Sequence, residues 1–239
     1  MASPLEQFTV KPWVQIDVAG YDISFTNSSA AMLATLAVIT IFVTFGMRKT
    51  ALVPDRWQSG VEMCYEFIAK MLGDTAGSDG RKYFPFIFTL FMFVLAANLI
   101  GMVPWLHSFT FTSHIAVTFA MATFVFIGVT LIGFITHGFK FLSFFVPHGA
   151  PWYLLILLIP IEIISYLSRP ISLSVRLFAN MVAGHTMLKV FGGFVVSLGA
   201  LGGVFAVSAF LPFAFIVALT GLELLVACLQ AYVFAMLTC

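Results

Sequence analysis

Long runs of apolar residues without charge are the feature that most limits how this chain can fold. Residues 30–46, 84–101 and 115–136 contain no Asp, Glu, Lys or Arg. An α-helix needs about 20 apolar residues to cross the ~30 Å hydrocarbon core of a bilayer. Each run with its flanks meets this length, so the sequence predicts helices that cross a membrane.

The composition excludes a soluble domain. Of the 239 residues, 61% are hydrophobic and only 9% are charged, whereas a soluble domain has about 25% charged residues. The net charge is +1 without a basic cluster, which gives no indication of a nucleic-acid partner. The spacing of Cys64, Cys228 and Cys239 is not that of a metal or redox site, and no phosphate loop is present. We therefore expect free thiols and no cofactor.

We predict an all-α integral membrane protein with about five membrane helices, folded as one membrane domain over residues 1–239. An N-terminal arm is followed by a first span, an amphipathic helix on the membrane surface, a two-helix hairpin and a long, strongly tilted hairpin. The expected bounds of these segments are 1–28, 29–47, 51–76, 84–136 and 150–239.

Local signals refine these segments. Asn27-Ser28-Ser29 is expected to cap the first span, and a Gly-rich turn over 77–80 to end the surface helix. The second span, expected over 84–105, ends near Pro104 with Trp105 at the membrane interface. Apolar residues recur at helical spacing in the surface helix; they are Trp57, Val61, Tyr65, Ile68 and Leu72.

Basic residues predict the orientation in the membrane. Six of them lie between the first two spans and Lys140 follows the third span, whereas the arm has Lys11 alone. By the positive-inside rule, residues 48–82 and Lys140 are cytoplasmic, or on the matrix side in a mitochondrion, and the arm is on the opposite side.

The two C-terminal apolar stretches, 152–189 and 191–238, are longer than one perpendicular span requires. Two long tilted helices would explain this length. The alternative is two shorter spans in each stretch, with turns near Pro170 or Pro212. A bend between the stretches is expected at the glycines 192, 193, 199, 202 and 203.

Ionisable residues inside the first of these stretches are the candidates for function. Glu162, Arg169 and Arg176 are seven residues apart, so they share one face if the helix is continuous, and Asn180 lies one turn beyond. Pro170 should kink this helix, and Ser168 and Ser172 could satisfy the freed backbone groups. Burying charge in hydrocarbon costs from ~3 to over ~10 kcal/mol, so intramembrane charges indicate function by default.

The types of these residues indicate proton transport. Burial can tune both Glu and His towards neutral pH, so Glu162 forms one candidate carrier site and His185 with Glu223 a second. Gln230 shares a face with Glu223 and could lie alongside Arg176. Arginine does not release its proton. A fixed cation between two carrier sites suits two separate proton paths with a barrier between them.

Residues 172–185, Ser-Leu-Ser-Val-Arg-Leu-Phe-Ala-Asn-Met-Val-Ala-Gly-His, resemble subunit a of the F-type ATP synthase, also called subunit 6. Further similarity covers residues 4–8, 84–93, 97–104 and 224–238. The pair His185 and Glu223 resembles the mitochondrial and alphaproteobacterial branch. Relatives usually extend some residues past Cys239.

The resemblance implies a non-catalytic proton-conducting stator subunit in the Fo membrane sector, which couples proton flow to ring rotation and ATP synthesis. Its partners would be the c-ring, b-type peripheral stalk subunits, other ATP synthase subunits and lipid. Arg176 would face the ring carboxylates, with Asn180 and Gln230 nearby. His185, Glu223 and Asn98, the only polar group deep in the second span, would line one half-channel, and Glu162 the other.

Two other functions would fit a polytopic membrane protein. A self-contained proton-coupled secondary transporter would need a complete substrate site, often at broken, repeated helices, and we see no such repeat. A membrane scaffold would not need Glu162, Arg176 and Glu223 at membrane depth. A start at Met1 without a transit peptide favours a bacterial inner membrane, although a mitochondrially encoded protein would look the same.

Overall fold

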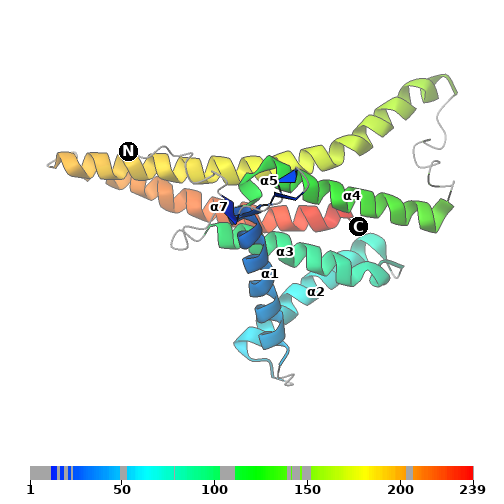
Figure 1. Cartoon of the computed structure of the whole chain (residues 1–239), viewed down its shortest axis with the longest axis horizontal. Helices are drawn as coiled ribbons and strands as arrows, with labels where there is room; N and C mark the ends of the chain where they lie inside the picture. The colour runs from blue at the N-terminus through cyan, green and yellow to red at the C-terminus, as the bar shows by residue number, and fades with distance from the viewer. Residues whose placement is uncertain are drawn as a thin grey trace.

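A computed structural model describes residues 12–14, 17–18, 21–22, 24–48, 53–77, 79–102, 111–138, 141, 146, 152–202 and 207–238. Helices dominate these residues (Figure 1), and five of the described helices are long and apolar enough to cross a membrane. The all-α membrane fold is therefore confirmed. Several expectations lie outside the described residues, namely those on residues 4–8, Lys11, Pro104, Trp105, Lys140, Gly203 and Cys239.

The N-terminal arm contains four short strands that form two antiparallel pairs, β1 (Pro12–Val14) with β4 (Phe25–Thr26) and β2 (Asp17–Val18) with β3 (Tyr21–Asp22). Helix α1 (Asn27–Gly46) follows directly. Its cap is Thr26, whose hydroxyl accepts from the Ser29 amide at 3.4 Å, so the prediction of a cap at Asn27-Ser28-Ser29 was wrong. Thr26 has the extended backbone that a cap requires.

Helix α2 (Arg56–Ala76) is the expected amphipathic helix, and it begins five residues later than predicted. Val61, Ile68 and Leu72 are buried, as their spacing predicted, but Trp57 and Tyr65 are 64% and 53% exposed. Trp57 meets Phe42 of α1 edge-on, with centroids 6.1 Å apart, and Tyr65 packs on Phe84 and Phe88 of α3. Gly77, with φ of 63°, ends the helix because glycine adopts this conformation without steric cost.

The two-helix hairpin consists of α3 (Phe84–Gly101) and α4 (Ile115–His137). The short 3-10 helix η2 (Asp79–Tyr83) leads into α3, and a second one, η4 (Phe111–Ser113), precedes α4. Helix α3 ends before Pro104, earlier than the predicted 105. The main core forms around α3, with Val94 from α3, Ile68 from α2 and Phe234 from the last helix among its most buried members.

The C-terminal region is one pair of long helices, α5 (Trp152–Leu201) and α7 (Phe210–Thr238). This result selects two long helices over four shorter spans. Helix α5 continues through Gly192, Gly193 and Gly199 and ends at Leu201, directly before Gly202, which has a φ of 68°. At about 1.5 Å per residue, the 50 residues of α5 extend far beyond the ~30 Å hydrocarbon core.

Helix α5 bends in its N-terminal part (Figure 1), where it contains Pro160 and Pro170. Proline removes a backbone donor and commonly kinks a helix. Ser168 donates to the Ser165 carbonyl at 2.8 Å. The second such bond comes from Ser174 to the Ile171 carbonyl at 2.9 Å, rather than from the expected Ser172.

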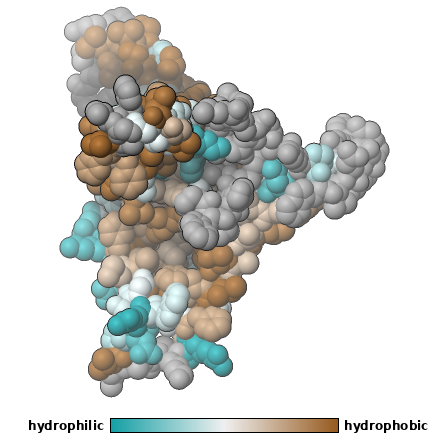
Figure 2. Space-filling view, turned by 90° about the vertical axis from the view of Figure 1, so that its left-hand side faces the viewer, coloured by the Kyte–Doolittle hydropathy of each residue, from teal (hydrophilic) through white to brown (hydrophobic). Residues whose placement is uncertain are grey.

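Apolar side chains cover most of the outer surface. Figure 2 shows hydrophobic residues over much of the described surface on one side, with hydrophilic residues gathered at its lower end. Exposed Arg48, Asp55 and Arg56 lie at the turn between α1 and α2, which Figure 1 places at that end. In water such a surface would be unfavourable, so it is the surface of a protein that lies in lipid.

Candidate functional site at the α5–α7 hairpin

The candidate site is built on the antiparallel pair α5 and α7 (Figure 1), and two places along this pair bring together residues of both helices. A Cβ atom at Gly184 of α5 would overlap the carboxyl group of Glu223 of α7. Further along, Arg169 of α5 and Thr238 of α7 line the same cavity.

Glu223 approaches α5 at the first of these places, next to His185 in the sequence. Glu223 lies against Gly184, whose missing side chain leaves the space for the carboxyl group, and His185 is the next residue along α5. Both side chains are half-buried. The His185 Nε2 and the Thr186 hydroxyl are buried and have no hydrogen-bond partner among the described residues. Glu223 therefore meets α5 at Gly184, and contact between Glu223 and His185 themselves stays a prediction.

Asn98 joins the same region from α3. It is fully buried and donates from Nδ2 to the Ala227 carbonyl of α7 at 3.4 Å. Ala227 is one turn past Glu223 and three residues before Gln230. Buried oxygens of Asn98 and Gln230 have no partner in the described part of the chain, so both can accept a hydrogen bond from water. A band of polar groups therefore crosses α3, α5 and α7.

Arg176 stands apart from this band on the exposed surface of α5. Gln230 of α7 and Leu177, the residue after Arg176, are buried, and Asn180 one turn beyond Arg176 is half-buried. The guanidinium of Arg176 has no ion pair with a described residue. A fixed positive charge on an exposed apolar helix surface is costly in hydrocarbon unless it faces water or an opposite charge.

Glu162 lies in a different place, a cavity of about 470 Å³ lined by Tyr166 and Arg169 of α5. Gly133 and Phe141 line it on the α4 side, and Leu72, Tyr83 and Thr238 close it from α2, η2 and α7. Arg169 shares the cavity with Glu162, so the continuous helix does place these two on one face, as the seven-residue spacing predicted. Arg176, one further repeat along, does not line this cavity.

The helix geometry separates the two polar regions. Glu162 precedes Arg176 by fourteen residues and His185 follows it by nine, about 21 and 14 Å along the helix axis. Each region holds a group that can bind and release a proton, and neither reaches the other through described polar side chains. Sequence reasoning did not identify Gly184, Tyr166 or Thr130 as parts of these regions.

Gly184→Ala is expected to lower stability where other glycine replacements in α5 do not. Ala favours a helix over Gly by about 1 kcal/mol, but here its Cβ must displace the Glu223 carboxyl, and overpacking costs typically ~1–3 kcal/mol. The control is Gly193→Ala, because nothing lies within 4 Å of that added atom. Thermal unfolding of the full chain in detergent should show a lower midpoint for Gly184→Ala than for Gly193→Ala, and equal midpoints would contradict the close approach.

Comparison with known proteins gives one family. The family model described as "ATP synthase A chain" matches residues 29–239. Proteins called "ATP synthase subunit a" are similar over the whole chain. The protein from Paramagnetospirillum magneticum is 59% identical, covering 100% of this chain and 96% of that protein. The protein from Rhodospirillum rubrum is 56% identical with the same coverage, and that from Parvibaculum lavamentivorans 58% identical, covering 99% and 90%.

Proposed function

The chain belongs to the ATP synthase A chain family, and from this membership we propose that it is the stator subunit that conducts protons to and from a rotating ring of c subunits. In this proposal two half-channels meet the ring at different depths. His185, Glu223 and Asn98 line the half-channel from the proton-rich side, and Glu162 lies on the half-channel to the cytoplasm. Arg176, with Asn180 and Gln230 nearby, faces the ring.

Family membership also indicates the assembly to which the chain belongs. The chain is a membrane subunit of ATP synthase, it is not catalytic alone, and its partners are other ATP synthase subunits. Relatives from bacteria and the apolar helices support a place in the bacterial inner membrane. Among these partners we propose the c-ring and the b-type peripheral stalk as direct neighbours.

The observation that carries the proposal is the separation of two proton-binding regions by an exposed arginine on one helix. Glu223 against Gly184, the residue before His185, supplies one region, and the Glu162 cavity supplies the other. A single continuous proton wire would not need a permanent cation between its ends, whereas two half-channels need a barrier there.

The mechanism follows from the charge of Arg176. A ring carboxylate that faces Arg176 is held ionised, since an opposite charge nearby favours the charged form. A proton that arrives through the His185 and Glu223 region neutralises a ring carboxylate, which can then turn into lipid. After rotation this proton leaves through the Glu162 cavity. Each charge that crosses makes ~2.3 kcal/mol available per 100 mV.

Purification in mild detergent tests this proposal against its rival. We expect the chain to copurify with a c-ring, and the reconstituted complex to pump protons when ATP is supplied. A self-contained transporter would instead show counter-transport when the chain is reconstituted without partners. Absence of a ring from every assembly that contains the chain would contradict the proposal.

A further inference from the structure

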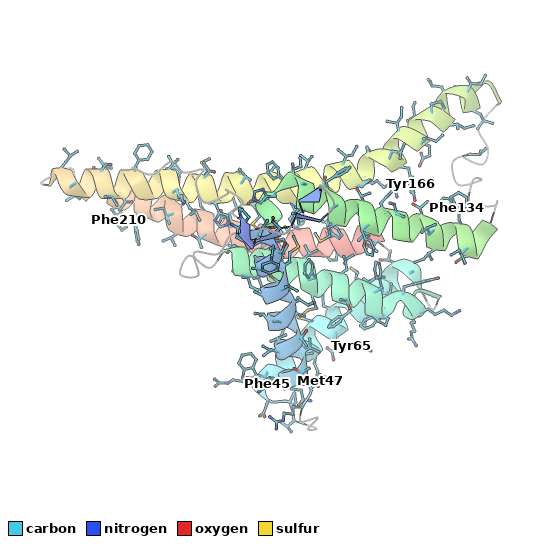
Figure 3. All side chains as sticks on the ribbon, in the orientation of Figure 1. Phe45, Met47, Tyr65, Phe134, Tyr166 and Phe210 are labelled. Carbon is cyan, nitrogen blue, oxygen red and sulfur yellow. The ribbon has the colours of Figure 1, made fainter. Side chains whose placement is uncertain are left out.

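Tyr166 occupies a place in the Glu162 cavity that the proposed function does not yet use. It lies four residues after Glu162 and three before Arg169, and all three side chains line the cavity. Residues three and four apart are neighbours on a helix surface. Tyr166 is therefore situated between the carboxylate and the guanidinium, on the side of α5 that faces α4 (Figure 3).

Contacts from α4 fix the orientation of the Tyr166 ring. The hydroxyls of Tyr166 and Thr130 are 2.8 Å apart. Thr130 uses its own hydrogen to bond the Phe126 carbonyl at 2.7 Å, so Tyr166 is the donor in the bond between the two. The ring also packs on Phe126, with centroids 4.8 Å apart. These contacts hold the phenol in one position.

Arg169 is placed over this fixed ring. Its Cζ lies 5.5 Å from the centroid of Tyr166, within the range of a cation–π interaction. Neither Arg169 nor Glu162 forms an ion pair with any residue of the described part. Side chains on a helix point towards its N-terminus, which directs Arg169 towards Glu162. The two are about 10 Å apart along the axis, so Arg169 released from the Tyr166 ring would extend along the same cavity towards Glu162.

We propose that Tyr166 is a positioning residue, which holds the Arg169 guanidinium over its ring and so prevents Arg169 from pairing with Glu162. This inference rests on the proposed role of Glu162 as a proton carrier. An ion pair with Arg169 would favour the ionised form of the Glu162 carboxylate. Glu162 would then be a poor acceptor of protons from the c-ring. With Arg169 retained on Tyr166, the carboxylate remains available for exchange.

The test measures ATP-driven proton pumping by the assembled complex in inverted membrane vesicles. Tyr166→Leu is expected to slow pumping by about two- to fivefold, the factor that corresponds to loss of a cation–π contact with an exposed cation such as Arg169. Tyr166→Phe retains the ring and should stay within about twofold of the unmodified complex, because the aromatic face is what holds the cation. The double variant Tyr166→Leu/Arg169→Gln should recover to the rate of Arg169→Gln alone, since no cation remains to pair with Glu162.

A role in packing alone would give a different pattern. The double variant would then be as slow as Tyr166→Leu, and this outcome would overturn the inference. Tyr65→Leu is the matched control, because it also removes a phenol that packs on two Phe rings but lies on α2, and its pumping should be unchanged. If Tyr166→Leu does not assemble with the c-ring, Tyr166→Met is measured in the same way. Methionine keeps apolar volume but has no aromatic ring.

Glu162→Gln separates failure of this inference from failure of the function on which it rests. If Glu162→Gln slows pumping while Tyr166→Leu does not, Glu162 is on the path and only the role of Tyr166 is refuted. If Glu162→Gln leaves pumping unchanged, both the cytoplasmic half-channel at Glu162 and the role of Tyr166 are refuted.

Discussion

Arg176→Ala is expected to abolish ATP synthesis and to make the membrane sector leak protons. The guanidinium is the fixed positive charge between the Glu162 cavity and the His185–Glu223 region, and it is exposed on α5 where a ring can approach. Without this charge, a ring carboxylate at that position would no longer be held ionised. A proton could then pass from one half-channel to the other through a stationary carboxylate, and no rotation would be needed.

The measurement combines ATP synthesis with the passive proton permeability of vesicles that contain the assembled complex. Arg176→Lys should also fail to support synthesis, because an ammonium lacks the planar fork and loses its proton more readily when buried. Arg48→Ala is the matched control, since it removes another exposed guanidinium at the end of α1. Normal coupled synthesis in Arg176→Ala would refute the barrier role.

Helix positions followed from the sequence because length and the absence of charge limit an apolar run to one structure in lipid. The helices α1, α3, α4, α5 and α7 all occur where these runs are. Helix ends were less predictable. The bend was expected over five glycines, but the chain leaves the helix only at Gly202. The earlier glycines have helical conformations, and their local sequence does not distinguish them from Gly202.

The candidate site was predictable in its residue types and not in its contacts. Intramembrane charge and seven-residue spacing identified Glu162, Arg176 and Glu223 as candidates. Gly184 and Tyr166 gave no comparable signal, since an apolar helix contains many glycines and aromatic residues. Their importance depends on what lies across from them, the Glu223 carboxyl and Arg169 with Thr130. Such contacts depend on how helices that are distant in the sequence pack against each other, which the local sequence does not show. The roles of all these residues stay predictions.

His185 and Glu223 should act as one proton-sharing unit, so that exchanging them is less damaging than losing either. Proton transfer by a positioned side chain is worth about 10²–10⁴-fold, and water in the same band can replace part of it. We therefore expect His185→Gln and Glu223→Gln each to slow ATP-driven pumping by roughly 10²-fold, the lower end of that range. The ring should still copurify, because neither group belongs to the buried core.

The exchange variant, His185→Glu with Glu223→His, restores one carboxylate and one imidazole to the same pair of positions. It should recover more activity than either single change, because the proton can again be passed between two carriers. Recovery should remain incomplete because the space at position 223 is limited. The space over Gly184 holds a carboxyl group, and the broader imidazole at position 223 must shift to fit there. The complex of the exchange variant must retain its c-ring for this comparison. If it then pumps no faster than the two single variants, the two residues act independently.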